Sequence, residues 1–403
     1  MDTRTLKTPP LTQRATATAP SVASPVPGSH HLVTTVGGQS HLTFGVEEEF
    51  LLVDARTWRL VPEASELLDD VREAALTLHG EGTSYQVESA TPVCDTLDSM
   101  RERLVESRGA LAAAARRRGC RLIANASPVL NPEMPIRLNL DKPRRRVRQA
   151  YFGALTDNLI GCGRHVHVGS LDLDTAAQVS NRIRPWLPTF IALSASSPIW
   201  NGRDTGHASW RSIMWASWPS AGVPPHFAAP GGHTRAVRSL IDSGAALDEG
   251  MVYWDMRPSV RWPTIELRAP DMSPSLDGAL FQASLSRALV THALRREREG
   301  VPCIEVPDAQ LRLARWLAAR EGLEGHALDP FTGVQTSAAG LARRLVNLLG
   351  PELDAVGDYA FVTRTLGKLV KQGSWAARQR TVFNIRNCPT DVLHYLAEET
   401  EAF

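Results

Sequence analysis

The chain has 403 residues, of which 43% are hydrophobic and 22% are charged, proportions typical of a folded globular protein. This composition excludes collagen-like chains, wholly disordered chains and small scaffolds held together by disulfides. The 44 lysines and arginines nearly balance the 43 aspartates and glutamates, so the chain lacks the basic excess typical of nucleic-acid-binding proteins.

The cysteines and the apolar runs indicate the cellular compartment of the protein. Five cysteines, an odd number without C-x-x-C spacing, argue against a disulfide framework or a thiolate zinc site and fit a reducing compartment. We interpret them as buried small apolar residues. No apolar run approaches the roughly 20 residues of a membrane-spanning helix, and the N-terminus lacks a secretion signal. We expect a cytoplasmic protein that binds neither membranes nor nucleic acid.

The N-terminal 40 residues differ in composition from the rest. Half of them are Thr, Ser, Pro or Gly, and none is Phe, Trp or Tyr. Such a segment cannot bury enough apolar surface to offset the entropy lost on ordering. The sequence therefore predicts a disordered tail over 1–40, with a targeting peptide as the alternative, and a single domain over 41–403.

The first predicted elements of this domain are a strand, a helix and a second strand. The strand covers 42–54 and ends in a turn. The helix covers 97–118, where apolar residues recur at helical spacing and Thr96 or Asp98 can cap the first turn. A short strand follows over 122–124.

Prolines and a change of pattern mark the later elements. A helical stretch over 176–193 should be kinked or divided by Pro185 and Pro188. The chain beyond Ser275 reads as a series of helices, over 276–296, 309–320, 341–349 and 391–399. The regular βαβ alternation of a doubly wound parallel sheet is missing. We expect an α+β fold with a largely antiparallel sheet and helices on one side, sheet-rich over 41–272 and helical over 273–403.

Three predicted strands alternate apolar residues with residues that bind metals or anions. The residues that share a face are Glu47 with Glu49, His165 with His167, and Glu266 with Arg268. A half-exposed strand of any sheet also alternates, so each strand alone reads as a solvated face. The residue types Glu, His and Arg in all three strands, together with Glu88 in a fourth predicted strand, favour a functional face instead.

If these strands are neighbours, their carboxylates converge, and lost hydration and mutual repulsion require neutralising cations. A donor set of carboxylate oxygens with one imidazole favours Mg²⁺ or Mn²⁺ over zinc. Because Mg²⁺ commonly shares its coordination shell with phosphate groups, a nucleotide is implied as well. The sequence has no P-loop and no glycine-rich dinucleotide motif, so metal ions and arginines would hold ATP.

From residue 41 to the end, the chain resembles the glutamate–cysteine ligase type 2 family, the bacterial ATP-dependent carboxylate–amine ligases. The motifs that carry the resemblance are GVEEEFLLVD at 45–54, QVE at 86–88, HVHVG at 165–169, NGRDTG at 201–206 with SWRS at 209–212, and YWDMRP at 253–258 leading into TIELR at 264–268. One departure is Arg164, where the family usually has a small or apolar residue. Strand parity directs Arg164 away from the polar face, which leaves the packing behind that strand open.

The resemblance implies that residues 41–403 form one catalytic domain with a glutamine-synthetase-like fold, in which an antiparallel sheet forms one wall of a funnel. The funnel would hold ATP and two or more divalent cations. One metal would be bound by Glu47, His165 and Glu266, and a second by Glu49, Glu88 and Glu81. For Glu81, a solvated loop acid is the alternative.

The implied reaction is phosphoryl transfer from ATP to a carboxylate, followed by attack of an amine that forms an amide and releases phosphate. Nominally, glutamate and cysteine would give γ-glutamylcysteine. Arg268 would bind the transferred phosphoryl group or the substrate carboxylate. His167 would stabilise the phosphorylated intermediate or hydrogen-bond a ligand glutamate. Arg211 lies in a predicted aromatic-rich loop and would clamp an anion or stack on tryptophans.

Two other functions are compatible with the same fold. A phosphotransferase would stop at phosphorylation of a carboxylate or guanidino group, and an inactive relative would only bind ligands.

Arg378 and Arg380 would reach a nucleotide or lie on a solvated helix face. The expected partners are small molecules, an amino-acid carboxylate and an amine, and the resemblance also suggests a homodimer.

Overall fold

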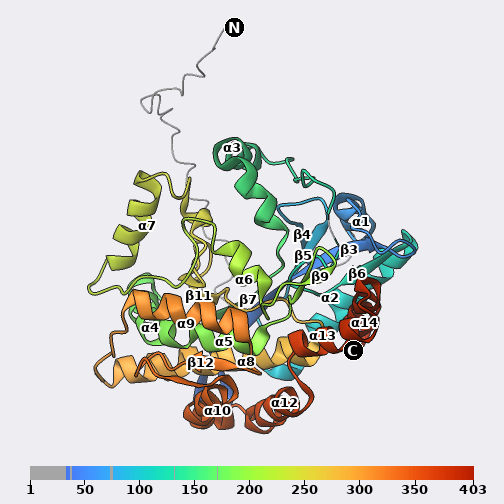
Figure 1. Cartoon of the computed structure of the whole chain (residues 1–403). Helices are drawn as coiled ribbons and strands as arrows, with labels where there is room; N and C mark the ends of the chain where they lie inside the picture. Colours follow the sequence, from blue (N-terminus) through green and yellow to red (C-terminus); the bar gives the residue numbers. More distant parts are fainter. Residues whose placement is uncertain (1–32, 37–38, 73–75, 131, 170) are drawn as a thin grey trace, which may run out of the picture. The chain divides into compact units, whose positions relative to one another are not determined.

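An antiparallel sheet of seven strands forms the centre of the fold (Figure 1), with the strand order β10, β11, β7, β3, β5, β4 and with β6 paired to β3. Its strands are β3 (Phe44–Asp54), β4 (Thr77–Gly80), β5 (Gln86–Ala90), β6 (Cys120–Ile123), β7 (Arg164–Gly169), β10 (Met256–Pro258) and β11 (Thr264–Leu267). The structure is a computed structural model that describes residues 33–36, 39–72, 76–130, 132–169 and 171–403. The predicted α+β class with an antiparallel sheet is confirmed.

The remaining elements surround this sheet. The helices are α1 (Ala64–Asp70), α2 (Leu97–Arg117), α3 (Pro143–Phe152), α4 (Leu173–Ile183), α5 (Leu187–Ser194), α6 (Trp210–Trp215), α7 (Gly232–Asp242), α8 (Leu276–Arg298), α9 (Asp308–Glu321), α10 (Ala338–Leu348), α11 (Gly350–Ala355), α12 (Tyr359–Gln372), α13 (Trp375–Arg386) and α14 (Pro389–Glu401). Short 3₁₀ turns are η1 (Gly153–Ile160), η2 (Arg184–Trp186) and η3 (Glu249–Met251). Two-stranded pairs are formed by β1 (Val33–Val36) with β2 (Gln39–Leu42), β8 (Ile199–Trp200) with β9 (Arg203–Asp204), and β12 (His326–Leu328) with β13 (Gln335–Ser337).

Local sequence signals predicted the bounds of most of the expected elements to within a few residues. Thr96 caps α2 in a reciprocal capping box, in which the Ser99 amide donates to Thr96 Oγ1 at 3.1 Å and the Thr96 amide donates to Ser99 Oγ at 3.3 Å. The predicted helical stretch over 176–193 is divided into α4, η2 and α5, with Pro185 and Pro188 at the breaks. Among the described residues, no helix has the length and apolar character needed to cross a membrane.

Two predictions need correction. Most of the predicted tail over 1–40 lies outside the described residues, but its last part, 33–36 and 39–40, belongs to the β1–β2 hairpin. The VTTV sequence of β1 has high β propensity, which the average composition of the tail obscured. The cysteines are all unpaired, but Cys303 and Cys388 are only half-buried.

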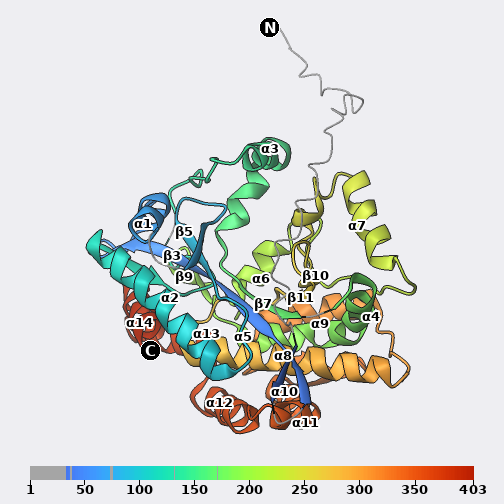
Figure 2. The ribbon, with the colours of Figure 1, turned by 180° about the vertical axis from the view of Figure 1, so that it is seen from behind.

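The two faces of the sheet have different neighbours. Glu48 and Val46 face α2 and α8, which lie beside β3 (Figure 2) and contact each other beneath the sheet. The opposite face carries Glu47 and Glu49. Helices were expected on one side only, but α14 contacts β6 from the other side, where Arg121 pairs with Glu401 at 3.1 Å. Helix α14 therefore covers the polar face at the β6 end.

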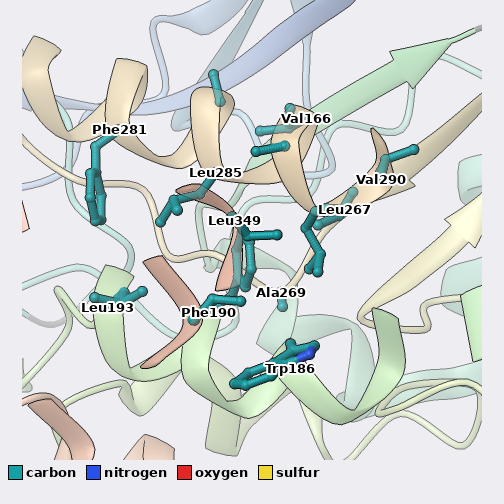
Figure 3. Close-up of a cluster of buried hydrophobic side chains, with 14 of the residues drawn as sticks. Val166, Trp186, Phe190, Leu193, Leu267, Ala269, Phe281, Leu285, Val290 and Leu349 are labelled. Atoms are coloured by element: carbon teal, nitrogen blue, oxygen red, sulfur yellow. The ribbon is translucent and has the colours of Figure 1, made fainter. Parts of the chain in front are cut away.

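The main apolar core lies between the sheet and the helices beneath it. Val166 of β7 and Leu267 of β11 pack with Phe281 and Leu285 of α8 and with Phe190 of α5 (Figure 3). All five side chains are at most 1% exposed. Fully burying an apolar side chain of this size stabilises the fold by about 1.5–3 kcal/mol. The residues that alternate with His165, His167 and Glu266 along β7 and β11 therefore anchor the polar face to a rigid core.

A buried ion cluster supports β3 from below. Glu48 accepts hydrogen bonds from Arg108 at 2.7 and 2.8 Å and from Arg164 at 2.8 Å, and all three side chains are fully buried. Burial opposes the charge of Glu48, but the two guanidinium groups outweigh it and lower its pKa to about 2. Arg164 thus points away from the polar face, as its parity predicted, and its packing is explained by Glu48.

Candidate active site

The polar residues predicted from the sequence meet on one face of the central sheet because the strand register aligns them. The cross-strand pairs are Glu47 with His165, Glu266 with His167, and Glu49 with Glu88. Directly opposite residues on one face have Cβ atoms about 5 Å apart. Four strands thus deliver their carboxylates and imidazoles to one small area, which we call the acidic face.

Glu47 lies at the centre of the acidic face. Its carboxylate oxygens are 3.0 Å from His165 Nδ1 and 3.3 Å from His167 Nε2. His165 also lies 3.8 Å from Glu49 and 3.9 Å from Glu266. Its side chain is only 6% exposed, against 27% for Glu47. The His165 imidazole therefore lies close to three carboxylates, those of Glu47, Glu49 and Glu266.

A second group of carboxylates lies beside the first. One oxygen each of Glu49, Glu81 and Glu88 lie within 4.8 Å of one another. Glu81 directly follows β4, and one of its oxygens accepts a hydrogen bond from the Gly82 amide at 3.0 Å. Glu49 accepts one from the Gly163 amide at 2.7 Å. The structure thus brings together the three acids that were predicted as one ligand set.

The other predicted ligand set is grouped differently. Within the same 4.8 Å limit, Glu47 groups with Glu88 and His165, and separately with His167 and Glu266. His167, predicted as a catalytic group, therefore lies among the candidate ligands, and its Nδ1 is 3.0 Å from Thr264 Oγ1. This geometry matches its alternative reading, a contact with a ligand glutamate.

The carboxylates differ in how their charge is balanced. Burial raises the pKa of Glu49 to about 8, and the neighbouring Glu81 adds to this. Burial, then Glu81 and Glu47, raise the pKa of Glu88 well above its usual range. These two carboxylates lack enough cationic partners within the described protein, as expected for acids that bind a cation.

Glu266, in contrast, is paired with two arginines. Arg257 Nε donates to it at 2.8 Å, and Arg268 Nη1 hydrogen-bonds its other oxygen. Against the effect of burial, Arg257 and then Arg268 lower the pKa of Glu266. Arg257 also donates to the Val252 carbonyl at 2.9 Å. Arg257 lies in the YWDMRP segment but was not predicted as a site residue, because only the pairing of β10 with β11 places it opposite Glu266.

Arg211 lies on a helix, which corrects the predicted loop. Ser209 caps α6 through the Ser212 amide, and Arg211 follows in its first turn. The Arg211 guanidinium donates to the carbonyls of residues 268–270 at 3.3–3.4 Å and lies 3.7 Å from Asp271. It is only 6% exposed. Its observed contacts hold the guanidinium against the backbone next to Arg268.

A basic helix at the edge of the acidic face was also missed. Helix α3 begins at Pro143 and carries four arginines in six residues. Arg145 donates to the Gly80 carbonyl next to Glu81, and Arg148 contacts the Tyr253 hydroxyl at 3.4 Å. The signal was the run RRRVR at 144–148, which sequence alone reads as a solvated helix face.

The C-terminal arginines contact neighbouring parts of the protein. Arg378 lies over the Trp375 ring at 4.7 Å and donates to the Gly373 carbonyl. Arg380 pairs with Asp204 at 2.8 Å. Both contacts are local to α13 or to the β8–β9 turn, as expected for a helix surface.

The chain is similar in sequence to a known protein family and to individual members of it. The family model described as "Glutamate-cysteine ligase family 2 (GCS2)" matches residues 43–392 of this chain. Two similar proteins are both named "putative glutamate–cysteine ligase 2-2". The one from Mycolicibacterium vanbaalenii is 41% identical over 89% of this chain and 98% of its own length. The one from Saccharopolyspora erythraea is 40% identical over 89% of this chain and 92% of its own length.

Solved structures share the fold at low sequence identity. The glutamate–cysteine ligase of Francisella tularensis in complex with AMP has a TM-score of 0.66 at 11% identity, covering 90% of this chain and 89% of that one. The complex of the prokaryotic ubiquitin-like protein Pup with its ligase PafA has a TM-score of 0.50 at 13% identity, covering 89% of this chain and 73% of that one. The chain belongs to the glutamate–cysteine ligase family 2 and is an ATP-dependent carboxylate–amine ligase.

Proposed function

We propose that this enzyme forms an amide through an acyl phosphate, with glutamate as the nominal carboxylate substrate and cysteine as the nominal amine. The observation that carries the proposal is the acidic face, where Glu47, Glu49, Glu88 and Glu266 meet two imidazoles and Arg268. The names of its relatives support this substrate pair, and the AMP in the Francisella structure supports the use of ATP. The five unpaired cysteines are consistent with a cytoplasmic location.

The residues of the acidic face fit divalent cations. Their donors are carboxylate oxygens and imidazole nitrogens, a set that suits Mg²⁺ or Mn²⁺. The raised pKa values of Glu49 and Glu88 indicate negative charge that the protein itself does not neutralise. Glu47, His165, His167 and Glu266 would hold ions on one side, and Glu49, Glu81 and Glu88 on the other. Bound cations would neutralise phosphate oxygens during phosphoryl transfer.

The side chains that would act on the substrates lie beside these ligands. In the first step, a carboxylate oxygen attacks the γ-phosphorus and the bond to ADP breaks. In the second, the amine attacks the acyl carbon, loses a proton and expels phosphate. Arg268, which hydrogen-bonds Glu266, would bind the phosphoryl oxygens through both steps. Arg257 hydrogen-bonds the other oxygen of Glu266 and would fix the orientation of this candidate ligand.

The experiment that tests this proposal measures two products in one reaction. Purified protein, ATP and Mg²⁺ are incubated with glutamate and a panel of amines, and ADP and the amide are quantified by mass spectrometry. We expect equal amounts of ADP and amide with at least one amine. Glu47→Gln should abolish both products, whereas Glu102→Gln, an exposed residue of α2, should leave both unchanged. ADP release without any amide would overturn the proposal.

A further inference from the structure

Four buried N–H groups near the acidic face find no acceptor among the described residues. They belong to the side chains Arg148 (Nε), Arg211 (Nε), Trp215 (Nε1) and Trp218 (Nε1). Arg211 is 6% exposed and Trp218 is 2% exposed. A buried donor without an acceptor is unfavourable and uncommon in native proteins, so each such group calls for an explanation.

Three of these residues and Tyr253 form a continuous line, which we call the donor row: Arg148, Tyr253, Trp215 and Arg211. Arg148 Nη1 is 3.4 Å from the Tyr253 hydroxyl. The Tyr253 and Trp215 rings pack edge to face with centroids 5.0 Å apart. Trp215 Nε1 and Arg211 Cγ lie 3.1 and 3.3 Å from the point where a Cβ on Gly161 would stand. The row thus connects α3 to α6.

Each end of the donor row lies against a glycine beside the second carboxylate group. Arg148 Nη2 lies 3.3 Å from the point where a Cβ on Gly82 would stand, and Gly82 follows Glu81. Arg211 would clash with any Cβ on Gly163, whose amide holds Glu49. Arg148, Trp215 and Tyr253 are all half-buried, so part of each side chain faces solvent. The row therefore borders the second carboxylate group of the proposed reaction centre.

The chemistry of the donor row fits an anion of low charge. Its guanidinium and indole groups can only donate, and the Tyr253 hydroxyl adds one more O–H group. The Arg211 guanidinium is already committed to carbonyls 268–270 through both terminal nitrogens, which leaves its Nε. One uncommitted guanidinium and several neutral donors suit a carboxylate better than a polyanionic phosphate, which several cations would bind.

We infer that the donor row binds a second, non-reacting carboxylate of an amino-acid substrate. This inference rests on the proposed function and names the residues that select α-amino acids over simple carboxylates or amines. Arg148 contributes the charge, and Trp215 and Tyr253 direct neutral donors to the same group. The reacting carboxylate would lie beside the Arg268 side chain.

The test pairs variants of the row with substrates that lack one carboxylate. The variants are Arg148→Ala, Arg148→Lys and Trp215→Phe, the last of which keeps an aromatic ring but removes the N–H. Glutamate is compared with 4-aminobutyrate, and cysteine with cysteamine. Arg146→Ala is the matched control, because Arg146 is exposed on the same helix and donates only to carbonyls of residues 140 and 141. Circular dichroism verifies that each variant folds.

We expect Arg148→Ala to lower kcat/KM for the full substrate of one pair about 10- to 100-fold, the range of a hydrogen bond to a charged group. The analogue lacking the carboxylate should lose less than about 2-fold. Trp215→Phe should cost the full substrate about 3- to 10-fold, and Arg148→Lys should recover part of the loss.

Equal losses for both members of both pairs would overturn the inference, as would no loss at all. A rise in the KM for ATP alone would also overturn it, because it would assign the row to phosphate. If wild-type protein made no amide from any substrate, the proposed function itself would fail, which is a distinct result.

Discussion

Three consecutive glutamates on β3 have different environments because a strand turns successive side chains to opposite faces. Glu47 and Glu49 belong to the acidic face, whereas Glu48 is enclosed with Arg108 and Arg164 beneath the sheet. A motif of three acids therefore combines two candidate ligands with one structural residue. The alternation of side chains along the strand predicted this division. Arg164, together with Arg108, supplies the positive charge that balances Glu48 in the buried layer beneath the sheet.

Glu48→Gln should destabilise the protein by about 3–5 kcal/mol, because it leaves two buried arginines without a counter-charge. Glu48 has a lowered pKa, about 2 against an ordinary 4.5. Its charge therefore stabilises the folded state fully above pH 4.5, and this contribution is lost as pH falls toward 2. Urea unfolding at several pH values measures the difference between variant and wild type. A difference below 1 kcal/mol at pH 7 would contradict the role of the ion cluster.

Arg257→Ala should weaken Mn²⁺ binding about 10- to 100-fold, since the residue orients Glu266 rather than contacting an ion. Titration calorimetry with the purified protein measures the affinity directly. Arg261→Ala, exposed in the loop between β10 and β11, serves as the control and should bind Mn²⁺ like wild type. Unchanged affinity in Arg257→Ala would show that Glu266 needs no support from β10.

At the scale of elements, the alternation within single strands was readable from sequence, but the pairing between strands was not. Glu47, His165 and Glu266 were found because each alternates with buried apolar residues. Arg257 and Arg148 were missed because their positions depend on how β10 and α3 pack against other elements, whereas Arg211 was identified as a candidate anion-binding residue. A basic run such as RRRVR has no local feature that distinguishes a ligand site from a solvated face.

Helix α2 offers a test of local stability. Thr96→Ala removes the capping box and should lower the free energy of unfolding by about 1 kcal/mol. Glu102→Ala on the exposed side of the same helix should change it by less than about 0.5 kcal/mol. Denaturant titration compares the two variants. Equal effects would mean that the cap contributes nothing beyond helix propensity.

At the scale of the whole molecule, the acidic face should couple cation binding to stability. Mn²⁺ at 100 times its Kd should stabilise the fold by about 2.7 kcal/mol and raise Tm, and EDTA should reverse the shift. Glu88→Gln removes one of the repelling carboxylates, so it should raise Tm without Mn²⁺ and reduce the shift with it. Thermal scans of both proteins measure this. A wild-type Tm that does not change when Mn²⁺ is added would contradict the assignment of the acidic face as a cation site.

The near-neutral overall charge conceals this local excess of acids, with arginines from β10, the end of β11 and α3 around it. The central claim is that this arrangement activates a carboxylate by phosphorylation before an amine attacks. The most direct measurement uses a substrate with ¹⁸O in the reacting carboxylate and follows the isotope in released phosphate by mass spectrometry. The acyl-phosphate route predicts one ¹⁸O atom in each phosphate formed with the amide. Unlabelled phosphate released alongside the amide would contradict it.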